Sequence, residues 1–312
     1  MLTVMSSELP SSNQSQAGKA ARGFSDSKTG AAHVQPLDTG LYIVSTPIGN
    51  LRDITLRAID TLQAADEVLA EDTRVARKLF DTYNIRSKVS PYHDHNGAQR
   101  RPELLEKLKD GAAIALISDA GTPLVSDPGW KLVHAVLEEG MKVIPIPGAS
   151  ALLAGLVASG VASDRFMFCG FLPAKSGARQ KEARALAGVE ASLVFYESGP
   201  RLAVSLQDLA DIMGGQREAA VARELTKLFE ETRRGTLSEL ATHYQEAGAP
   251  KGEIVLLIGP PIAEEITPER LDAALYAALQ SGSVKAASAE VAELLGIPKR
   301  EAYQRALQLK NG

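Results

Sequence analysis

The sequence of 312 residues predicts an α/β protein that has two α/β domains and a small helical domain at its C-terminal end. Three observations support this fold class. In the first half, apolar strand-like runs alternate with helical segments, a pattern typical of βαβ units around a mainly parallel sheet. In the second half, several strand-like runs follow one another with no helix between them, so we expect antiparallel pairs. After Gly259-Pro260-Pro261 only helical periodicity continues.

Residues 1–38 are rich in Ser, Ala, Gly and Gln. Because this segment has no apolar periodicity, it would bury too little surface to offset the entropy lost on ordering, and we expect a disordered tail. The apolar core of a signal peptide is absent. No run along the chain approaches the roughly 18 apolar residues of a membrane span. These features predict a cytoplasmic protein with no membrane association.

Composition narrows the classes of function. The chain is 45% hydrophobic and 23% charged, as in ordinary globular proteins. Its single cysteine, Cys169, excludes an intramolecular disulfide framework and a cysteine-ligated zinc cluster, and it suits a reducing compartment. The formal net charge is −4, so a nucleic-acid partner would have to meet a local basic patch rather than the overall field.

The first α/β domain is expected over residues 39–148. Asp127-Pro128 is typical of an N-cap followed by proline at the first helical position, and Gly140 of a helix end. The strand-like runs are residues 41–45, 67–71, 88–92, 112–118 and 141–146. The helical segments are residues 53–64, 73–83, 102–110 and 128–139.

The second α/β domain is expected over residues 149–261, followed by a helical domain over residues 262–312. The second domain has helical segments at residues 150–159 and 201–213, and strand-like runs at residues 165–171, 192–196, 218–223, 228–235 and 253–258. The helical domain has helices at residues 267–279, 284–295 and 298–309. Its spacing is that of a helix-turn-helix, and it fits a DNA-reading unit and a small helical cap or dimer element equally well.

Three strand-like runs end in turns of glycine, proline and small polar residues. These turns are residues 46–50, 119–123 and 147–150. An open α/β sheet binds small polar ligands at the carboxyl ends of its strands. One such turn would need no ligand, but three in one domain predict a shared pocket. The last turn also joins the two domains, so we expect the pocket in the cleft between them.

Four polar clusters follow other strand-like runs. They lie at residues 70–74, 92–96 and 170–179, and, as a split cluster, at residues 195–201 and 222–227. One such cluster is usually a helix cap or a solvated ion pair. Four of them at strand ends predict a substrate site. His93-Asp94-His95 has the spacing of metal ligands, but no further ligand set accompanies it, so no metal site is predicted.

Cations in and near these clusters form either a local basic surface for phosphates or ordinary helix-face charge, since acidic residues are interspersed. The sequence alone favours neither a phosphate-binding surface nor ordinary helix-face charge. The cations include Arg74, Arg77 and the group at residues 175–184.

Taken in order along the chain, these motifs resemble those of the tetrapyrrole-methylase superfamily, and within it the bacterial enzymes that methylate a cytidine 2′-hydroxyl of small-subunit ribosomal RNA. The resemblance runs from about residue 41 to residue 259, and the C-terminal helices resemble the helix-turn-helix appended to those enzymes. Each motif alone is weak, whereas the set is highly specific. The motifs are Thr46-Pro-Ile-Gly-Asn-Leu-x-Asp53-Ile-Thr55, Ala70-Glu-Asp-Thr-Arg74, His93-Asp-His-Asn96, Ser118-Asp-Ala-Gly-Thr-Pro123, Phe171-Leu-Pro-Ala-Lys175, Phe195-Tyr-Glu-Ser198 and Ala222-Arg-Glu-Leu-Thr-Lys227.

The resemblance implies an S-adenosylmethionine-dependent methyltransferase, normally a homodimer, that acts on 16S ribosomal RNA of the small ribosomal subunit. It implies that the cofactor is folded in the inter-domain cleft. The chain has no Gly-x-Gly-x-x-Gly fingerprint, as expected where no pyrophosphate is seated at a helix N-terminus. The residues implied for the cofactor are Pro47, Asp119, Ala120, Gly121, Thr122, Pro123, Ser150, Ala151, Leu172, Tyr196, Ala222 and Gly252.

Methyl transfer from a sulfonium is an in-line displacement, so positioning the hydroxyl behind the methyl carbon supplies most of the catalysis. A side chain that accepts the hydroxyl proton would add roughly 10²–10⁴-fold. Arginines remain charged and offer paired donors to phosphate. The candidates for the base are Asp72, His93, His95, Lys175 and Glu224. The residues expected to contact RNA are Arg74, Arg77, Arg179, Arg201, Arg223 and Lys227.

The chain departs from the family pattern at Gly199-Pro200, where a histidine commonly stands, and Pro200 cannot transfer protons. Two other classes of function fit the same features less well. A tetrapyrrole C-methyltransferase shares the fold but needs no appended helices. A DNA-binding regulator would use those helices and keep the α/β domains as a ligand sensor. A nicotinamide dehydrogenase lacks its glycine fingerprint here.

Overall fold

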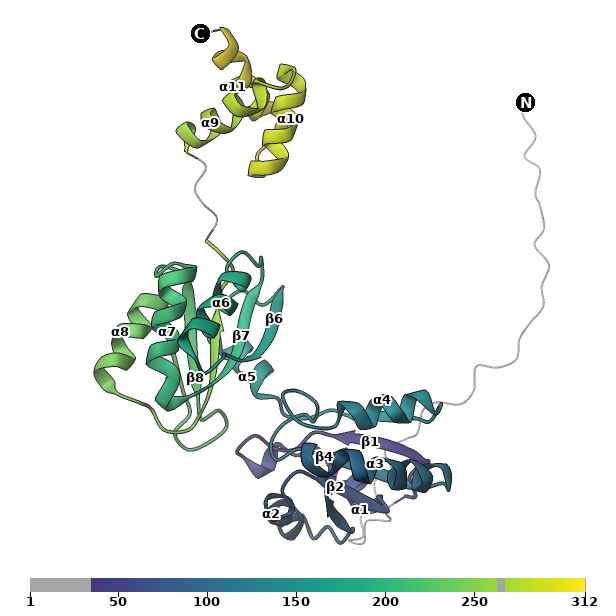
Figure 1. Ribbon diagram of the computed structural model, residues 1–312. Coiled ribbons are helices and arrows are strands. Elements are labelled where there is room, and N and C mark those ends of the chain that lie inside the picture. The colour runs from purple at the N-terminus through teal and green to yellow at the C-terminus, as the bar shows by residue number, and fades with distance from the viewer. Residues whose placement is uncertain (1–34, 263–266, 312) are drawn as a thin grey trace, which may run out of the picture.

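The computed structural model describes residues 35–262 and 267–311. Residues 1–34 of the predicted tail lie outside this range. The described chain forms two α/β units, each built on one five-stranded sheet, followed by three helices (Figure 1). The predicted fold class is confirmed. Within the described residues, no helix has the length and apolar character needed to cross a membrane.

The sheet of the first domain is entirely parallel and has the order β3-β2-β4-β1-β5. Four of the five strands lie within the runs expected from the sequence, and β1 begins one residue earlier than its run, at Gly40. Because the strands are parallel, their carboxyl ends lie at one edge of the sheet, where the predicted ligand turns begin. The strands are β1 (Gly40–Val44), β2 (Glu67–Ala70), β3 (Val89–Pro91), β4 (Ala113–Ile117) and β5 (Val143–Ile146).

Helices cover both faces of this sheet because alternate strand residues point to opposite sides. Tyr42 and Val44 pack with α1 and α2, whereas Leu41 and Ile43 pack with α3 and α4. A short 3-10 helix, η1 (Leu51–Asp53), precedes them. The helices are α1 (Leu56–Ala64), α2 (Thr73–Tyr83), α3 (Asp94–Lys109) and α4 (Trp130–Glu138).

Several helix starts differ from the sequence-based expectation. Helix α1 begins at Leu56 and not at Asp53, which belongs to the 3-10 helix η1. Helix α3 begins at Asp94, not at Pro102, which lies inside the helix. Proline removes the hydrogen bond to the carbonyl four residues earlier, and this is tolerated because Pro102 and Ala98 are both exposed to solvent. Helix α4 begins at Trp130 after Gly129, which has φ 127°, so the prediction of Asp127 as its N-cap was wrong.

The sheet of the second domain has the order β6-β7-β10-β8-β9, and only β6 and β7 are parallel. The antiparallel pairs expected from the sequence are therefore confirmed. The predicted run at residues 228–235 begins later, because the exposed Leu228 and Phe229 lie in the loop before β9. The strands are β6 (Phe166–Phe171), β7 (Ser192–Ser198), β8 (Glu218–Arg223), β9 (Glu231–Thr236) and β10 (Glu253–Ile258).

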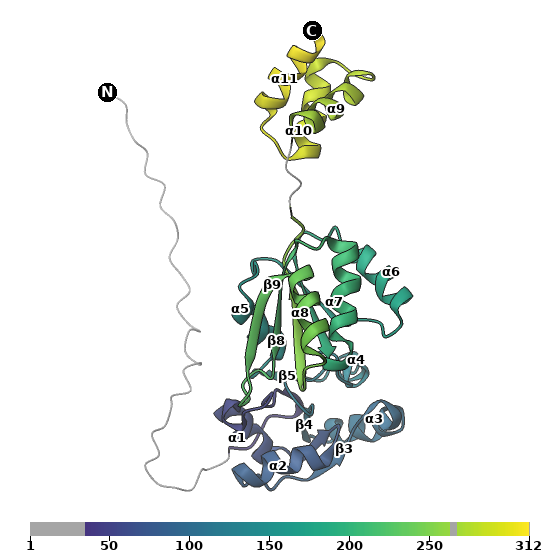
Figure 2. The same ribbon diagram turned by 90° about the vertical axis from the view of Figure 1, so that its left-hand side faces the viewer.

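One face of this sheet packs against α6 (Ser176–Leu186), α7 (Gly199–Met213) and α8 (Leu237–Ala247). The other face packs against α5 (Ala151–Ser159) (Figure 2). Ile48, from a turn of the first domain, belongs to this second core and so joins the two domains. Helix α8 was not predicted, although Thr236 and Glu239 form a capping box that the sequence contains.

The last three helices pack around a core of their own. They are α9 (Pro268–Leu279), α10 (Val284–Leu295) and α11 (Lys299–Asn311), and Leu275, Val291 and Ala306 meet at their centre. Arg305 of α11 forms an ion pair of 2.6 Å with Asp272 of α9. The three expected helices are confirmed within one or two residues at each end.

A buried carboxylate fixes α3 against the parallel sheet. Glu67 of β2 has a side chain only 5% exposed and forms ion pairs with Lys107 at 2.7 Å and Arg100 at 2.9 Å, both from α3. Ser90 of β3 also donates to it. Burial opposes the charged form of Glu67, but the donors Lys107, Ser90 and Arg100 together lower its pKa to about 2. This cluster sets the position of α3, which has His93 as its N-cap and His95 in its first turn.

Glu67→Gln is expected to lower the free energy of unfolding by about 2–4 kcal/mol at pH 7, because it leaves two cations without their buried partner. Urea denaturation followed by circular dichroism would measure this loss. The pKa of Glu67 is lowered in the folded state, so its stabilisation is complete above about pH 4.5 and is lost as the pH falls towards 2.

The matched control is Glu103→Gln, because Glu103 pairs with the same Lys107 and Arg100 but its side chain is 56% exposed. We expect this change to cost far less stability than Glu67→Gln, because solvent screens an exposed ion pair. Equal losses for the two variants would contradict the anchoring role of Glu67.

Candidate active site between the two domains

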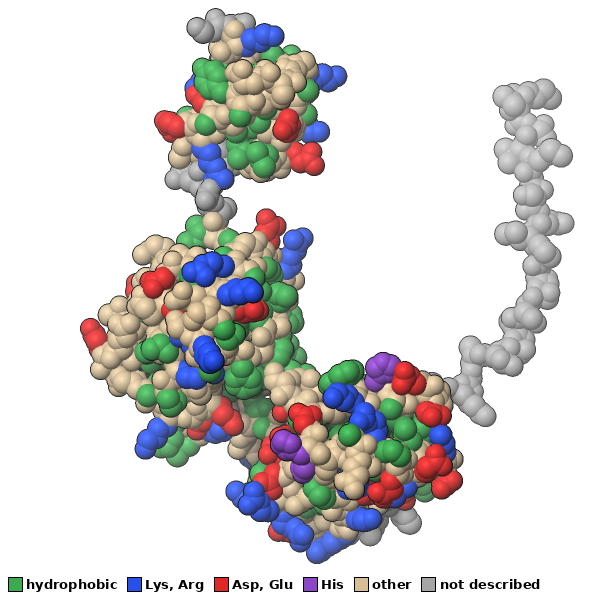
Figure 3. Space-filling view, in the orientation of Figure 1, with side chains coloured by type: hydrophobic (Ala, Val, Ile, Leu, Met, Phe, Trp, Pro, Cys, Tyr) green, Lys and Arg blue, Asp and Glu red, His purple; other side chains and the backbone are tan. Residues whose placement is uncertain are grey.

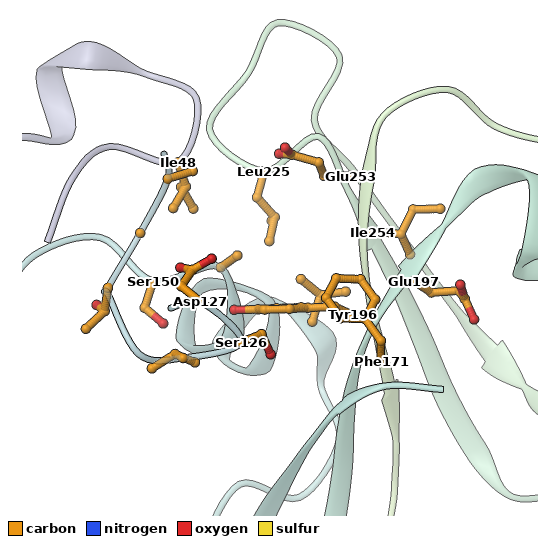
Figure 4. Close-up of a pocket in the computed structure, with 16 residues that line it drawn as sticks. Ile48, Ser126, Asp127, Ser150, Phe171, Tyr196, Glu197, Leu225, Glu253 and Ile254 are labelled. Carbon is orange, nitrogen blue, oxygen red and sulfur yellow. The ribbon is translucent and has the colours of Figure 1, made fainter. Parts of the chain in front are cut away.

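A pocket of about 220 Å³ lies between the two α/β domains, at the carboxyl edge of the parallel sheet (Figure 4). The first domain contributes its three predicted turns, and the second contributes β6, β7, β10 and the loop after β8. Six of the residues expected to hold a cofactor line it: Ala120, Gly121, Thr122, Ser150, Ala151 and Tyr196. The other lining residues are Ile48, Val125, Ser126, Asp127, Phe171, Glu197, Leu225, Glu253, Ile254 and Val255.

Main-chain hydrogen bonds hold the turns of the first domain together. The N–H of Thr46 donates to the carbonyl of Gly121 at 2.8 Å, and the N–H of Gly121 donates to the carbonyl of Thr46 at 3.1 Å. Gly121 has φ +80°, a conformation that glycine adopts without strain. The hydroxyls of Ser45 and Thr122 lie 2.9 Å apart. Gly148 packs so close to Ser45 that an added Cβ would lie 2.9 Å from its side chain.

The second domain contributes an aromatic wall. Tyr196 lies edge-on to Phe168 at 4.9 Å and to Phe171 at 5.6 Å between ring centres. Burial raises the pKa of Tyr196, and the charge of Asp127 raises it further. A hydrogen bond with the main chain of Leu152 lowers this pKa in part. In Figure 4 the hydroxyl end of Tyr196 extends across the pocket toward Asp127. The pocket therefore has main-chain turns on one side and an aromatic surface on the other.

Asp127 is a pocket residue that the sequence analysis missed, because Asp-Pro resembles a helix start. Here Asp127 is half-buried in the cleft. Burial, and after it the charges of Glu71 and Asp119, raise the pKa of Asp127 to about 6. A hydrogen bond with the Ser118 side chain acts in the opposite direction. The sequence could have indicated this role, because Asp127 follows the predicted ligand turn at residues 119–123 by only four residues.

Acidic residues gather along the same edge of the sheet, beside histidines (Figure 3). Burial raises the pKa of Glu71, and the carboxylates of Asp119 and Asp94 raise it further. The nearby His93 lowers this pKa in part. The N–H of Asp72 donates to Asp119 at 3.0 Å. Within the described residues, no group of three or more potential ligands is arranged for a metal ion.

Asp72 caps α2 and binds Arg74. Its carboxylate accepts the N–H of Arg74 at 2.8 Å and forms an ion pair with that guanidinium at 2.5 Å. The side-chain hydrogen bond from Arg74 is the main reason that the pKa of Asp72 is lowered to about 2. A carboxylate held in this way is a weak proton acceptor near neutral pH.

His93 and His95 lie at the first turn of α3, with their rings edge-on at 5.9 Å. The main-chain N–H of His93 donates to the Asn96 side chain at 2.9 Å. The Nδ1 atom of His93 is buried and has no hydrogen-bond partner among the described residues. Contact with a substrate would therefore be made through Nε2.

The loop after β8 is fixed by a compact ion cluster. Lys227 pairs with Glu224 at 2.8 Å and with Glu253 at 2.9 Å. The hydrogen bond from Lys227 is the main reason that the pKa of Glu224 is lowered, which makes Glu224 a poor base. Gly252, with φ +101°, lies so close that an added Cβ would be 2.3 Å from the Glu224 carboxylate.

Three of the arginines expected to contact RNA are engaged within the second domain. Arg179 is only 3% exposed and pairs with Asp208 at 2.6 Å, so it holds α6 against α7. Arg201 binds the carbonyl of Leu172 and pairs with Glu197 at 3.3 Å. Arg223 pairs with Glu231 at 3.0 Å. By contrast, Arg74, Arg77 and Lys175 are exposed.

The remaining residues expected around the cofactor lie next to the pocket rather than in its lining. Pro47 precedes Ile48, Leu172 follows Phe171 and is buried, and Ala222 is fully buried in β8. Asp119 and Pro123 flank the lining residues 120–122.

Gly199, at the departure from the family pattern, supports the pocket indirectly. An added Cβ there would lie 1.7 Å from the carbonyl oxygen of Pro250, so the backbone at this point admits only glycine. The contact holds the 248–252 loop against the start of α7.

Two family models match the chain. The model of the tetrapyrrole (corrin/porphyrin) methylases matches residues 40–241, and the model of the RsmI C-terminal HTH domain matches residues 264–310. A curated relative from Mesorhizobium japonicum, "Ribosomal RNA small subunit methyltransferase I", is 51% identical over 89% of this chain and 94% of its own. One of the same name from Erythrobacter litoralis is 50% identical over 88% and 97%.

A solved structure has the same fold. It is the uroporphyrin-III C-methyl transferase from Thermus thermophilus complexed with S-adenosyl homocysteine. Its TM-score is 0.51 at 21% identity, and the match covers 70% of this chain and 97% of that one.

Gly252→Ala is expected to weaken binding of S-adenosylhomocysteine at least about tenfold, measured by calorimetry. The added methyl would displace Glu224 and with it the main chain at Glu253 that lines the pocket, and the positive φ adds strain. Gly248→Ala is the matched control in the same loop, because Gly248 has φ +78° but no atom within 4 Å of an added Cβ. Equal affinities of the two variants would contradict this role of Gly252.

Proposed function

Since this chain belongs to the tetrapyrrole (corrin/porphyrin) methylase family, we propose that it transfers a methyl group from S-adenosylmethionine to the ribose 2′-hydroxyl of a cytidine in the decoding region of 16S ribosomal RNA. The chain is a methyltransferase of this family, and the RNA target is the finer part of the proposal. The substrate would be free 16S RNA or the small ribosomal subunit, in the cytoplasm. The support for the RNA target is the agreement of relatives about half identical over nearly the whole chain, all named for the small-subunit RNA.

The observation that carries the cofactor assignment is the pocket at the inter-domain joint. The turns at residues 46–50, 119–123 and 147–150 present main-chain groups on one side, and Tyr196 presents an aromatic surface on the other. A nucleoside joined to an amino acid needs both kinds of surface. When bound there, the cofactor supplies an electrophilic methyl group.

The chain itself has to orient the ribose and accept its proton. Among the candidate bases, Asp72 and Glu224 have lowered pKa values because Arg74 and Lys227 bind them. We assign the proton acceptor to His93, which lies at the acidic edge of the sheet beside Glu71 and Asp94. Glu67 holds its helix in place through Arg100 and Lys107.

Phosphate contacts are assigned to Arg74, Arg77 and Lys175, which are exposed on the elements that border the cleft. They satisfy the requirement for a local basic surface on a chain with a net charge of −4. Arg179 is excluded from this set by its buried pairing with Asp208. A tetrapyrrole substrate is not favoured, because methylases of that class match at only 17–21% identity.

A homodimer is the assembly that the surface supports best. The edge strand β6 exposes Phe166, Met167 and Phe171, and α5 exposes Leu153 and Val157. In Figure 3 hydrophobic side chains gather on the flank of the second domain where Figure 1 shows β6. An open strand edge with apolar side chains is usually covered by a partner. A second copy of the chain is the proposed partner.

The proposed reaction predicts labelling of one cytidine ribose in 16S RNA when the protein is incubated with small ribosomal subunits and labelled S-adenosylmethionine. His93→Ala is expected to lower kcat by about 10²-fold or more and to leave cofactor affinity within about threefold. Mass spectrometry of RNA fragments would locate the methyl group.

His134→Ala is the control for this experiment, because His134 is exposed on α4. Labelling of uroporphyrinogen instead of RNA would refute the RNA target. Wild-type turnover by the His93 variant would refute only the role of that residue.

The dimer predicts a solution mass about twice the 33.1 kDa of the chain, measured by light scattering after gel filtration. Val157→Glu is expected to yield the monomer, since it places a charge in the apolar interface. Leu137→Glu, at an equally apolar exposed position of α4, is the control and should remain dimeric. A wild-type monomer at micromolar concentration would contradict the proposal.

A further inference from the structure

All charged residues that line the pocket are acidic. Its lining contains the acidic residues Asp127, Glu197 and Glu253 and, among the residues that line it, no lysine, arginine or histidine. A negative pocket without a cation favours a positively charged ligand over a neutral one. The size of that preference depends on which of the three carboxylates remains unneutralised.

Two of the three carboxylates are already satisfied by the protein. Glu197 accepts hydrogen bonds from the N–H of Ser198 at 2.8 Å and the hydroxyl of Ser205 at 2.7 Å, and pairs with Arg201 at 3.3 Å. In Figure 4 its carboxylate points away from Asp127 and the pocket centre. Glu253 pairs with Lys227.

Asp127 differs because no ion pair with it occurs within residues 35–262 and 267–311. The groups that face it are Glu71 from the end of β2, Asp119 and Ser118 from the end of β4, and Tyr196 from β7. Two of these are acids, and neither of the other two is a cation. The negative charge of Asp127 is therefore available to a ligand.

The aromatic wall completes the site. Tyr196 extends toward Asp127, with Phe168 and Phe171 packed edge-on around it. A carboxylate next to aromatic rings is the arrangement that recognises organic cations such as quaternary ammonium groups, because charge and ring quadrupole both attract the cation. A sulfonium is a cation of the same class.

We propose that Asp127 makes this pocket discriminate between the charged sulfonium cofactor and its neutral thioether product. The inference rests on the proposed function. S-adenosylmethionine carries one positive charge more than S-adenosylhomocysteine, and the two are otherwise alike apart from the methyl group. Asp127 attracts the sulfonium, which only the methyl donor carries, so this attraction disappears when the methyl group has been transferred.

The consequence is a pocket that takes up the methyl donor and releases the spent cofactor. Product release limits the turnover of many enzymes. A contact that is present with the substrate and absent with the product shortens the residence of the product without weakening uptake of the substrate. Asp127 is thus a specificity-determining residue for the cofactor and is not assigned any proton transfer.

Calorimetry with S-adenosylmethionine and with S-adenosylhomocysteine tests the inference on wild type and Asp127→Asn at pH 8. The substitution should lower affinity for S-adenosylmethionine about tenfold or more and leave affinity for S-adenosylhomocysteine within about threefold. Asp60→Asn, the same chemical change at an exposed position of α1, should change neither affinity.

Equal losses for both ligands, or no loss for either, would overturn the inference. A wild-type protein that binds neither ligand would instead overturn the proposed function. If Asp127→Asn does not fold, the wild-type protein alone still tests the inference with sinefungin, in which a charged amine replaces the sulfonium. Sinefungin should bind like S-adenosylmethionine. Equal affinity for sinefungin and S-adenosylhomocysteine would contradict the inference.

The pH dependence gives a second readout. Asp127 is charged only above its pKa of about 6, so the preference of the wild type for S-adenosylmethionine should grow as the pH rises through this value. Asp127→Asn should lose this dependence. An unchanged pH profile in the variant would assign it to Glu71 or Asp119 and overturn the role of Asp127.

Discussion

The parallel pairing of the first sheet is the constraint on which the rest of the structure depends. Because β1, β4 and β5 run in the same direction side by side, the turns that follow them meet at one edge. The paired hydrogen bonds between Thr46 and Gly121 then fix two of these turns to each other. The chain leaves the same edge after β5 and continues directly into α5, so the second domain necessarily begins at the pocket that it closes.

Charge is distributed around this edge in two zones. Carboxylates gather where β2 and β4 end, and burial, together with their mutual proximity, raises the pKa values of Glu71 and Asp127. Cations such as Arg74 and Arg77 lie further out on α2, where phosphates would approach. This separation suits a reaction that brings a cationic cofactor and a polyanionic substrate to one site, because each meets surface of the opposite sign.

Much of the fold follows from the sequence, because strand alternation and turn chemistry are local signals. The parallel sheet of the first domain, the antiparallel pairs of the second and most helix ends were predicted in this way. Helix α8 was missed although its capping box is visible in the sequence, and α3 was shortened because proline is normally excluded from helix interiors. Residues of the three turns line one pocket, since the carboxyl ends of parallel strands converge.

The individual roles of charged residues could not be predicted, because they depend on partners far away in the chain. Nothing local indicates that Arg179 pairs with Asp208, 29 residues away, or that Asp127 faces Glu71 rather than capping a helix. The same applies to Glu67, whose partners come from a helix more than 30 residues later. Burial and pairing decide which of several similar side chains remains available to a ligand.

A crystal structure of the protein with S-adenosylhomocysteine tests the central claim most directly. The account predicts that the ligand lies in the inter-domain cleft, in contact with Thr122 and Ser150 on one side and Tyr196 on the other, with its sulfur turned toward Asp127. A ligand bound elsewhere on the molecule, or one that contacts a single domain only, would contradict it.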